Sequence, residues 1–363
     1  MIRVVIDGAA LADPYSRGRG FGRYVQSLLT SLPQMADLQI GVLVLPGTEL
    51  PPGVTPIPIR RFNKHALLAS PEHLLRLGLD VARARPDVFH GPTNEPPIAS
   101  KRPVVQTLHD IIPLLASDPG FRWERKLWRL RAFAMRRADR VICISRWAAD
   151  CGIRYLGLRA DRIRVIYHGV TPIFAPSPVP PMVADPYFLF VSEYAAGKGY
   201  PEVFEVMRTV AASGEPHSLK VAGRLSDSNR PAVERMLAES GCRDRVELLG
   251  YVPDEELAAL YRGATALLFT SRREGFGRPP IEAMASGTPI ICFDNTSLPE
   301  IVGDSGILIP DGDTRAFAES ALRLIRDDGL RADMSARALG RVRLFDWNRC
   351  ASEHAEVYRS LAG

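Results

Sequence analysis

The segment from Ser271 to Pro289 constrains this chain more than any other part of the sequence. It carries two carboxylates eight residues apart, Glu274 in a Gly-rich turn and Glu282 in a short helix that a Pro pair opens. Apolar runs on each side predict a strand before the turn and another after the helix. A strand, a Gly-rich loop, a helix and a strand in this order present helix N-terminal N–H groups to a ligand. Because an ionised carboxylate only accepts hydrogen bonds, the pair favours a ligand rich in hydroxyl groups.

A plainer interpretation applies to any single pair of glutamates. Glycine is common at strand–helix turns, and a Glu on a surface helix is usually just solvated. Here, however, glycines and prolines surround the pair, and each fixes a backbone geometry that an ordinary amphipathic helix does not need. These residues are Gly275, Gly277, Pro279, Pro280 and Gly287. The segment therefore favours a binding loop.

The composition is that of a soluble globular protein, with 46% hydrophobic and 24% charged residues. At 363 residues the chain is too long for one ordinary core, so two domains are expected. The five cysteines form no Cys-x2-Cys pair, which favours reduced core thiols and a cytoplasmic location. Residues 1–7 look like a first strand rather than a cleavable targeting segment. No apolar run approaches the roughly 20 residues of a transmembrane helix.

Strands and helices alternate along the chain, which predicts parallel sheets with helices on both faces. In the first half we expect strands at 2–6, 39–45, 87–90, 103–107, 140–144 and 163–166, and helices at 22–32, 70–82, 121–138 and 146–156. In the second half we expect strands at 187–192, 218–222, 245–249, 264–269 and 289–293, and helices at 201–212, 229–240, 254–262, from 314 and from about 347 to 361. Between the halves, residues 172–186 hold six prolines, a density that predicts a semi-rigid linker.

The two halves differ in charge. Residues 1–172 carry 25 Lys and Arg against 14 Asp and Glu, a net +11, and the remainder carries a net −6. Residues 122–140 concentrate the excess, with eight basic and two acidic residues and two tryptophans. A basic amphipathic helix with tryptophans suits an anionic lipid surface or an acidic partner. An ordinary surface helix whose Arg stems cover apolar area is an equal alternative. Nucleic acid is disfavoured, because no groove-reading motif accompanies the basic residues.

The spacing of Glu274 and Glu282 in its strand–loop–helix context resembles the glutamate-x7-glutamate signature of family 4 retaining glycosyltransferases, the glycosyl transferases group 1. These enzymes use nucleotide sugars and have the GT-B fold, two doubly wound Rossmann-like domains that face a cleft. The resemblance implies an acceptor-side domain at 1–172, a linker at 173–186 and a donor domain at 187–346. It also implies that helix 347–363 packs back on the first domain.

A Gly-rich segment follows the first predicted strand. Gly18, Gly20 and Gly22 would let backbone N–H groups approach a pyrophosphate, although their spacing is not that of the dinucleotide fingerprint. In the resembled family a Gly-rich loop at this place lies over the donor phosphates and near the acceptor. The resemblance therefore implies donor contacts for Gly20 and Gly22 and acceptor-side positions for Arg23 and Tyr24.

His109 and Asp110 follow the predicted strand 103–107, at the strand end where α/β domains place chemistry. A lone His is more often structural. Members of the resembled family carry a His-Asp pair here, which implies that His109 contacts the transferred sugar and that Asp110 lies on the acceptor side. The extended form His-Asp-Ile-Ile-Pro-Leu is most similar to mannosyltransferases that build bacterial surface polysaccharides such as lipopolysaccharide.

The turn after strand 187–192 departs from the family pattern. Lys198 matches a family lysine that holds the donor diphosphate, but Ser192-Glu193 stands where Gly-Arg is usual. One cation of the usual pair is therefore missing. Arg224 and Arg278 are candidates to supply the charge, although neither is the expected residue.

No Asp-x-Asp motif ends a strand of the first half, and the one such motif in the chain, at 311–313, lies in a late turn. We therefore expect no metal site and no cofactor. Lys198, glycine N–H groups and a helix dipole would meet the charge of the donor diphosphate.

The resemblance implies a metal-independent retaining hexosyltransferase. It assigns Glu282 to the ribose of the donor, and Glu274 to hydroxyls of the transferred sugar beside Gly275 and the N–H groups of Phe276 and Gly277. GDP-mannose is the first candidate donor, with UDP- and dTDP-sugars behind it. The acceptor would be a glycan or a lipid-linked sugar, with peripheral contact to the inner face of the cytoplasmic membrane. A sugar-nucleotide epimerase, a phosphorylase and a non-catalytic GT-B scaffold are the alternatives.

Overall fold

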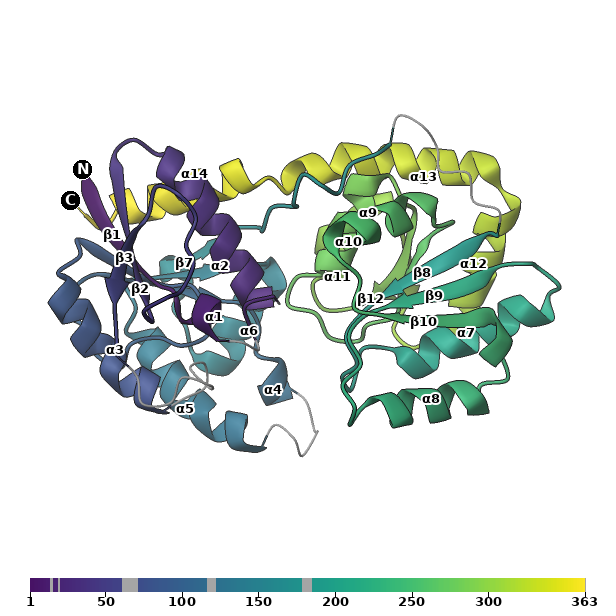
Figure 1. The fold of residues 1–363 in the computed structure, drawn as a ribbon, viewed down its shortest axis with the longest axis horizontal. Helices are drawn as coiled ribbons and strands as arrows, with labels where there is room; N and C mark the ends of the chain where they lie inside the picture. The colour runs from purple at the N-terminus through teal and green to yellow at the C-terminus, as the bar shows by residue number, and fades with distance from the viewer. Residues whose placement is uncertain (14–15, 19, 61–70, 116–121, 178–184, 363) are drawn as a thin grey trace. The chain divides into compact units, whose positions relative to one another are not determined.

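The computed structural model describes residues 1–13, 16–18, 20–60, 71–115, 122–177 and 185–362. The chain forms two compact units, the first made of Met1–Gly169 with Phe345–Gly363 and the second of Val170–Leu344 (Figure 1). The division at Gly169 falls three residues before the expected end of the first domain. Part of the expected Pro-rich linker, residues 178–184, lies outside the described residues.

Within the described residues, the first unit is built on a parallel sheet with strand order β3-β2-β1-β4-β5-β6-β7. The strands are β1 (Ile2–Asp7), β2 (Leu38–Val44), β3 (Thr55–Pro58), β4 (Val88–Gly91), β5 (Val104–Leu108), β6 (Arg140–Cys143) and β7 (Ile163–Val165). Val4 on β1 pairs with Ile40 on one side and Val88 on the other, so β1 is central. The strand order changes direction between β1 and β4, and such a switch point is where α/β sheets bind ligands.

The helices of the first unit cover both faces of its sheet (Figure 1). They are α1 (Ala9–Ala12), α2 (Gly20–Ser31), α3 (Pro71–Ala84), α4 (Ile112–Leu115), α5 (Arg122–Arg136), α6 (Arg146–Leu156) and α14 (Trp347–Arg359). The helix α14, at the end of the chain, shares one buried core with α2 and the strands, to which it contributes Ala351 and Tyr358. A helix more than 300 residues from β1 in the sequence is thus an integral part of this unit.

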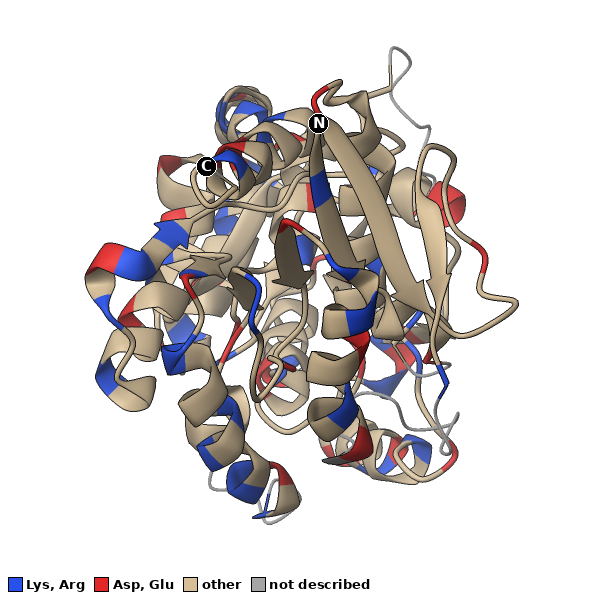
Figure 2. Cartoon of the chain, turned by 90° about the vertical axis from the view of Figure 1, so that its left-hand side faces the viewer, with Lys and Arg blue, Asp and Glu red and all other residues tan. Residues whose placement is uncertain are grey.

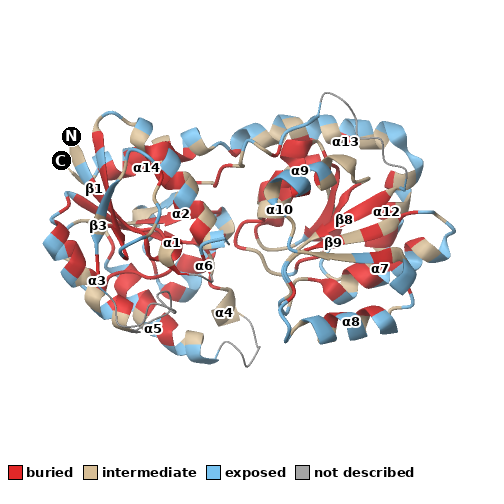
Figure 3. Ribbon diagram, in the orientation of Figure 1, coloured by how far each residue is buried: buried red, intermediate tan, exposed pale blue. Residues whose placement is uncertain are grey.

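The second unit repeats the plan with the strand order β10-β9-β8-β11-β12-β13, again parallel within the described residues. The strands are β8 (Tyr187–Val191), β9 (Ser218–Ala222), β10 (Val246–Gly250), β11 (Leu267–Phe269), β12 (Ile290–Asp294) and β13 (Ile307–Pro310). The helices are α7 (Tyr200–Ala212), α8 (Arg230–Glu239), α9 (Asp254–Gly263), α10 (Arg278–Ser286), α11 (Leu298–Val302), α12 (Thr314–Arg326) and α13 (Asp328–Arg341). Its switch point lies between β8 and β11. The central strands are buried on both faces, as Figure 3 shows, because helices cover each side.

The expected elements are present, with ends that differ by a few residues. The largest shift is in the strand predicted at 264–269, which begins only at Leu267. The sequence analysis missed β3, β13, α11, α13 and the short helices α1 and α4. The edge strand β3 contains Pro56 and Pro58, which obscure a strand pattern. All five cysteines are buried free thiols. Among the described residues no helix is long and apolar enough to span a bilayer.

Candidate active site

The switch point of the second unit brings together two residues that the sequence singled out separately. Lys198 lies in the loop after β8, and Glu274 lies in the loop after β11. Lys198 Nζ donates to Glu274 Oε1 across 2.7 Å, with 29% and 14% of the two side chains exposed. This pair is therefore accessible from solvent, and it stands where a ligand of a parallel sheet binds.

Glu282 lies one turn into α10 and is 5% exposed. Its Oε2 accepts from the Tyr261 hydroxyl at 3.1 Å, and its Oε1 lies 3.3 Å from Arg278 Nη2. A carboxylate has about four acceptor positions, so two contacts leave capacity for ligand hydroxyls. Arg278, a candidate source of positive charge for the phosphates, is half-buried beside Glu282, and its contact with a phosphate stays a prediction.

Two hydroxyl residues hold the loop that carries Glu274. Thr296 Oγ1 accepts from the Glu274 N–H at 3.2 Å. The carbonyls of Glu274 and Phe276 lie 3.0 and 2.9 Å from Ser297 Oγ and share its one O–H. Thr296 has φ 48°, a conformation that is an outlier for a β-branched residue. The sequence analysis missed both residues. An Asn-Thr-Ser turn directly after a strand is the signal that could have indicated them.

The loop ends at the N-terminus of α10. Gly277 precedes the helix with φ 101°, which only glycine adopts readily. Helix N-termini leave N–H groups unpaired, and Pro279 and Pro280 remove two such donors. Phe276 and Gly277 lie at this helix start, in the same loop as Glu274.

Glu193 and Arg224, which bear on the missing cation of the family pattern, both follow strands of the second unit. Glu193, which stands where a cation was expected, is exposed after β8. Arg224 follows β9, and its guanidinium lies 5.3 Å above the ring of Tyr251, which follows β10. The exposed Arg224 is thus engaged with an aromatic ring in the structure, and its contact with a diphosphate stays a prediction.

Both acids of the Asp-x-Asp motif have structural partners. Asp311 accepts from Asn295 Nδ2 at 2.8 Å, and Asp313 caps α12 by accepting from the Ala316 N–H at 2.9 Å. Among the described residues, no group of three or more His, Cys, Asp and Glu side chains is arranged to hold a metal ion.

In the first unit, His109 directly follows β5 and is 5% exposed. Its ring Nε2 lies 2.8 Å from the Pro92 carbonyl, and its backbone N–H donates to Asn94 Oδ1 at 3.0 Å. Burial lowers the pKa of His109 to about 4, so the ring is neutral near pH 7. Because a carbonyl only accepts, Nε2 carries the proton and Nδ1 keeps a lone pair. The ring is therefore built to accept a hydrogen bond through Nδ1, and Asn94, which the sequence analysis missed, fixes its backbone.

The rings of Phe21 and Tyr24 meet His109 edge-on, with centroids at 4.7 and 4.9 Å. Tyr24 is 2% exposed, and its hydroxyl lies 2.8 Å from His354 Nε2 on α14. The side chain of Tyr24 is thus buried among residues of its own unit, and its place on the acceptor side stays a prediction. Asp110 caps the next turn by accepting from the Ile112 N–H at 2.9 Å.

Helix α2 begins at Gly20, within the Gly-rich segment, so Gly20 and Gly22 lie in its first turn. A Cβ at Gly22 would collide with the carbonyl oxygens of Ser16 and Arg17, whereas one at Gly20 would meet nothing. Gly22 is thus required by the packing of its own loop, and Gly20 leaves the backbone at the helix start approachable. Arg23 is half-buried on the same helix.

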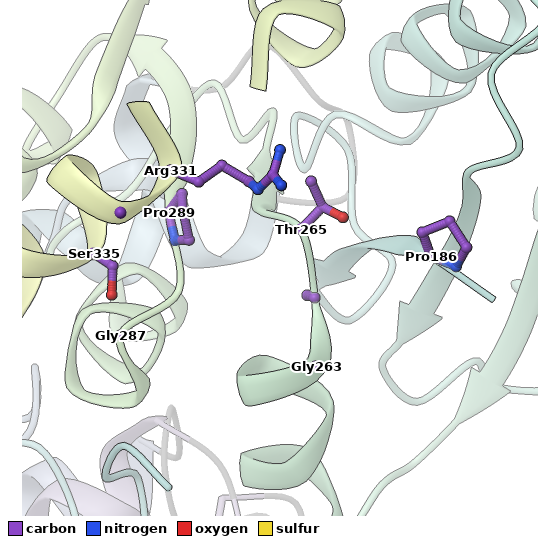
Figure 4. A pocket seen from close by; sticks show the side chains of 9 residues that line it. Pro186, Gly263, Thr265, Gly287, Pro289, Arg331 and Ser335 are labelled. Carbon is purple, nitrogen blue, oxygen red and sulfur yellow. The ribbon is translucent and has the colours of Figure 1, made fainter. Parts of the chain in front are cut away.

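A shallow cavity of about 340 Å³ lies elsewhere in the second unit. Gly263, Thr265 and Pro289 border it at the amino ends of β11 and β12, with Arg331 and Ser335 of α13 on the other side (Figure 4). This is the edge of the sheet opposite Lys198 and Glu274, so the cavity is separate from the candidate site.

Models of two glycosyltransferase domains match the chain in succession. Residues 18–173 match "Glycosyltransferase Family 4", and residues 179–341 match "Glycosyl transferases group 1". The chain belongs to the family 4 glycosyltransferases. The match to residues 18–173 includes His109. The match to residues 179–341 includes Lys198, Glu274 and Glu282.

Among curated relatives, the O-antigen chain mannosyltransferase B of Escherichia coli is 40% identical over 34% of this chain and 33% of its own. The serotype-specific mannosyltransferase WbdA of the same species is 28% identical over 70% of this chain and 33% of its own. A D-inositol 3-phosphate glycosyltransferase of Xylanimonas cellulosilytica is 30% identical over 61% and 57%. The family 4 chain thus spans about a third of the length of the two mannosyltransferases.

Solved structures share the fold over nearly the whole chain. The sucrose-phosphate synthase of Thermosynechococcus elongatus superposes with a TM-score of 0.83 at 20% identity and covers 99% of each chain. Anabaena HepE, solved in complex with UDP and glucose, gives a TM-score of 0.75 at 20% identity and covers 99% of this chain and all of its own. The fold is therefore GT-B, with two doubly wound Rossmann-like domains.

Proposed function

We propose that the protein is a metal-independent, retaining hexosyltransferase that moves a sugar from a nucleoside diphosphate to a glycan or lipid-linked acceptor. The observation that carries the proposal is the ion pair of Lys198 and Glu274 at the switch point, beside the N-terminus of α10. A diphosphate needs a cation and a sugar needs acceptors for its hydroxyls. The two side chains supply these from neighbouring loops.

The roles follow from the chemistry of each group. Glu282 accepts hydrogen bonds from the donor ribose, and Glu274 accepts them from hydroxyls of the transferred sugar. Lys198 neutralises the diphosphate as it leaves, and the N–H groups near Gly277 add the positive end of α10. From the first unit we assign His109 Nδ1 to a sugar hydroxyl, because its neutral ring accepts a hydrogen bond.

The reaction is best described as a front-face displacement. A double displacement needs an enzymic nucleophile opposite a general acid. We assign Glu274 to hydroxyls of the transferred sugar rather than to its anomeric carbon, and His109 is not an acid at neutral pH because burial lowers its pKa to about 4. The leaving phosphate is then the group that takes the acceptor proton, and Glu274 positions the sugar.

Mannose is our first candidate for the transferred sugar, because two of the relatives are mannosyltransferases. Incubating the protein with a panel of GDP-, UDP- and dTDP-sugars and assaying the released nucleotide tests the proposal without an acceptor. We expect slow hydrolysis of one donor, GDP-mannose before the others. Binding of a nucleotide sugar with no turnover, even with crude acceptor lipids and glycans, would indicate a non-catalytic scaffold, and interconversion of two sugars would indicate an epimerase.

A further inference from the structure

The loop that carries Glu274 also carries two consecutive arginines, Arg272 and Arg273, to which the sequence analysis gave no role. The Arg272 N–H donates to the Gly197 carbonyl at 2.8 Å, so this loop is joined directly to the loop that carries Lys198. The ion pair of Lys198 and Glu274 joins the same two loops a second time. The backbone of both arginines is therefore held next to the candidate site.

The guanidinium of Arg273 lies against Gly197, the residue before Lys198. Beyond its chain neighbours, the nearest atom that a Cβ at Gly197 would meet is Arg273 Nη1, at 3.8 Å. Gly197 has φ 85°, which favours glycine, so the loop of Lys198 leaves this space to a side chain from the neighbouring loop. The Arg273 guanidinium and the backbone of Lys198 are thus neighbours.

Arg273 is half-buried and keeps its hydrogen-bonding capacity. In the part of the chain that the structure describes, no hydrogen bond or ion pair engages its guanidinium. A guanidinium has five N–H donors and stays charged at every pH at which a protein is folded. At this place it therefore offers a full positive charge to a ligand.

The other arginines at this edge of the sheet already have partners. Arg272 lies 3.5 Å from carboxylate oxygens of Glu202 and Asp311. Arg224 and Arg278, the candidates from the sequence, contact an aromatic ring and a carboxylate. Each of these three would have to give up or share a contact to bind a phosphate, whereas the remaining arginine of the loop would not.

Positive charge is scarce in this half of the chain. Residues 1–172 carry a net +11, and Figure 2, which looks onto the first unit, shows many segments of its helices in blue. The remainder of the chain carries a net −6, and Glu193, where the family usually has an arginine, is exposed. A diphosphate carries more than one negative charge, and Lys198 brings a single positive one. A second cation for a diphosphate in the second unit therefore has to be placed individually.

We propose that Arg273 binds the diphosphate of the donor and supplies this second cation beside Lys198. The proposal rests on the proposed function, because it requires a nucleoside diphosphate at the pair of Lys198 and Glu274. The planar fork of a guanidinium matches two oxygens of a phosphate, so the contact would be bidentate. The loop of Glu274 would then bind both parts of the donor, the transferred sugar through the glutamate and the diphosphate through the arginine before it.

Calorimetric titration of the full chain tests the proposal, with GDP, UDP and dTDP, the three corresponding nucleosides, and inorganic pyrophosphate as probes. Arg273→Gln should weaken binding of the preferred nucleoside diphosphate by roughly 10- to 100-fold, since hydrogen bonds to a charged group are lost. It should weaken pyrophosphate binding as well and leave nucleoside binding nearly unchanged. Arg273→Lys should have an intermediate effect, because it keeps the charge and loses the fork.

Thermal unfolding distinguishes a phosphate contact from a structural role. Without ligand, Arg273→Gln should unfold at the parental temperature, because the guanidinium has no partner to lose. With the diphosphate it should be stabilised less than the parent protein. The matched control is Arg235→Gln on the exposed side of α8, which should behave like the parent protein in both measurements.

The outcomes separate this proposal from the proposed function. If the parent protein bound no nucleoside diphosphate, the proposed function would fail, and the role of Arg273 with it. If the parent protein bound one and Arg273→Gln bound it equally well, only the role of Arg273 would be overturned. The same holds if nucleoside binding fell as much as diphosphate binding, or if Arg224→Gln alone lost the diphosphate.

Discussion

The contact between Lys198 and Glu274 has a direct consequence for ligand binding. Without a ligand, the lysine and the glutamate are hydrogen-bonded to each other. In the proposed complex, a phosphate of the donor would bind the lysine and hydroxyls of the transferred sugar would bind the glutamate. Sugar-nucleotide binding then exchanges partners rather than exposing an unpaired charge. The free nucleotide carries ribose hydroxyls but none of the transferred sugar, so in the proposed roles it should engage Glu282 and Lys198 without engaging Glu274.

Substitution of the two glutamates should therefore have different effects. Glu274→Ala should lower donor turnover by roughly 10- to 100-fold, since hydrogen bonds to a charged group contribute about 1.5–3 kcal/mol. Nucleotide affinity should change little. Glu282→Gln should weaken nucleotide binding itself, because it replaces an acceptor by a group that is partly a donor and loses the pairing with Arg278.

Calorimetric titration with the nucleotide and a steady-state turnover assay separate these effects. Glu319→Gln, on the exposed face of α12, is the control for loss of a carboxylate. If both site variants turned over the donor at the parental rate, the two glutamates would be structural and the assigned roles would be wrong.

At the scale of elements, α14 is joined to the first sheet by a chain of hydrogen bonds. His354 Nδ1 lies 2.7 Å from the Cys350 carbonyl, so it donates, and its Nε2 accepts from Tyr24. The Thr107 hydroxyl then lies 3.2 Å from the Tyr24 oxygen and 2.8 Å from His90 Nε2. Tyr358, at the far end of α14, lies 2.7 Å from His90 Nδ1. Both histidines of this hydrogen-bonded chain, His90 and His354, are neutral at pH 7, because burial lowers the pKa of each.

This arrangement predicts an acid-sensitive first unit. Burial holds the pKa of His109 and His354 at about 4, and an unfolded chain has a His pKa of about 6.5. Between these values the unfolded state binds more protons, so the free energy of unfolding should fall as pH falls from about 6.5 to 4. Each of the two should contribute up to about 1.4 kcal/mol per pH unit in the middle of that range. His90 adds a further contribution of the same sign.

Urea unfolding followed by tryptophan fluorescence reports this unit selectively, because all four tryptophans, Trp123, Trp128, Trp147 and Trp347, belong to it. His354→Gln should unfold more easily at pH 7, by about 1–3 kcal/mol, since it leaves Tyr24 or Cys350 without its partner. It should also show a shallower pH dependence, as one titrating group is gone. If the free energy of unfolding of the parent protein did not change between pH 7 and 4, the buried histidines would not be neutral as described.

The elements also show what the sequence could and could not predict. Long apolar strands such as β1 and β5 and the strand–loop–helix around Glu274 were predicted because burial on both faces and special backbone geometry leave local patterns. The local sequence pattern is weak for two strands, the edge strand β3 and the short β13, which follows Gly306 and ends at Pro310. The role of Ser297 and Thr296 was missed because their contacts join two loops far apart in the sequence. Burial of Tyr24 depends on α14, more than 300 residues away, and no local pattern encodes it.

At the scale of the whole molecule, the chain consists of two units of the same architecture, and each offers a polar site at the carboxyl ends of its strands. The second unit supplies the cation, the carboxylates and the helix N-terminus. The first supplies a neutral acceptor ring held by Asn94 and Pro92. In the proposed reaction, Lys198 and backbone N–H groups would meet the charge of the diphosphate without a metal ion.

The central claim is retention without metal, and one NMR measurement tests it. The α-linked nucleotide sugar identified in the donor panel is incubated with the protein in excess chelator, and the anomeric proton of the first sugar product is followed over time. The account predicts that the α-configured product appears first, at a rate that chelator leaves unchanged and that Glu274→Ala lowers by roughly 10- to 100-fold. A β-configured first product, or activity that disappears with chelator and returns with Mg²⁺ or Mn²⁺, would contradict it.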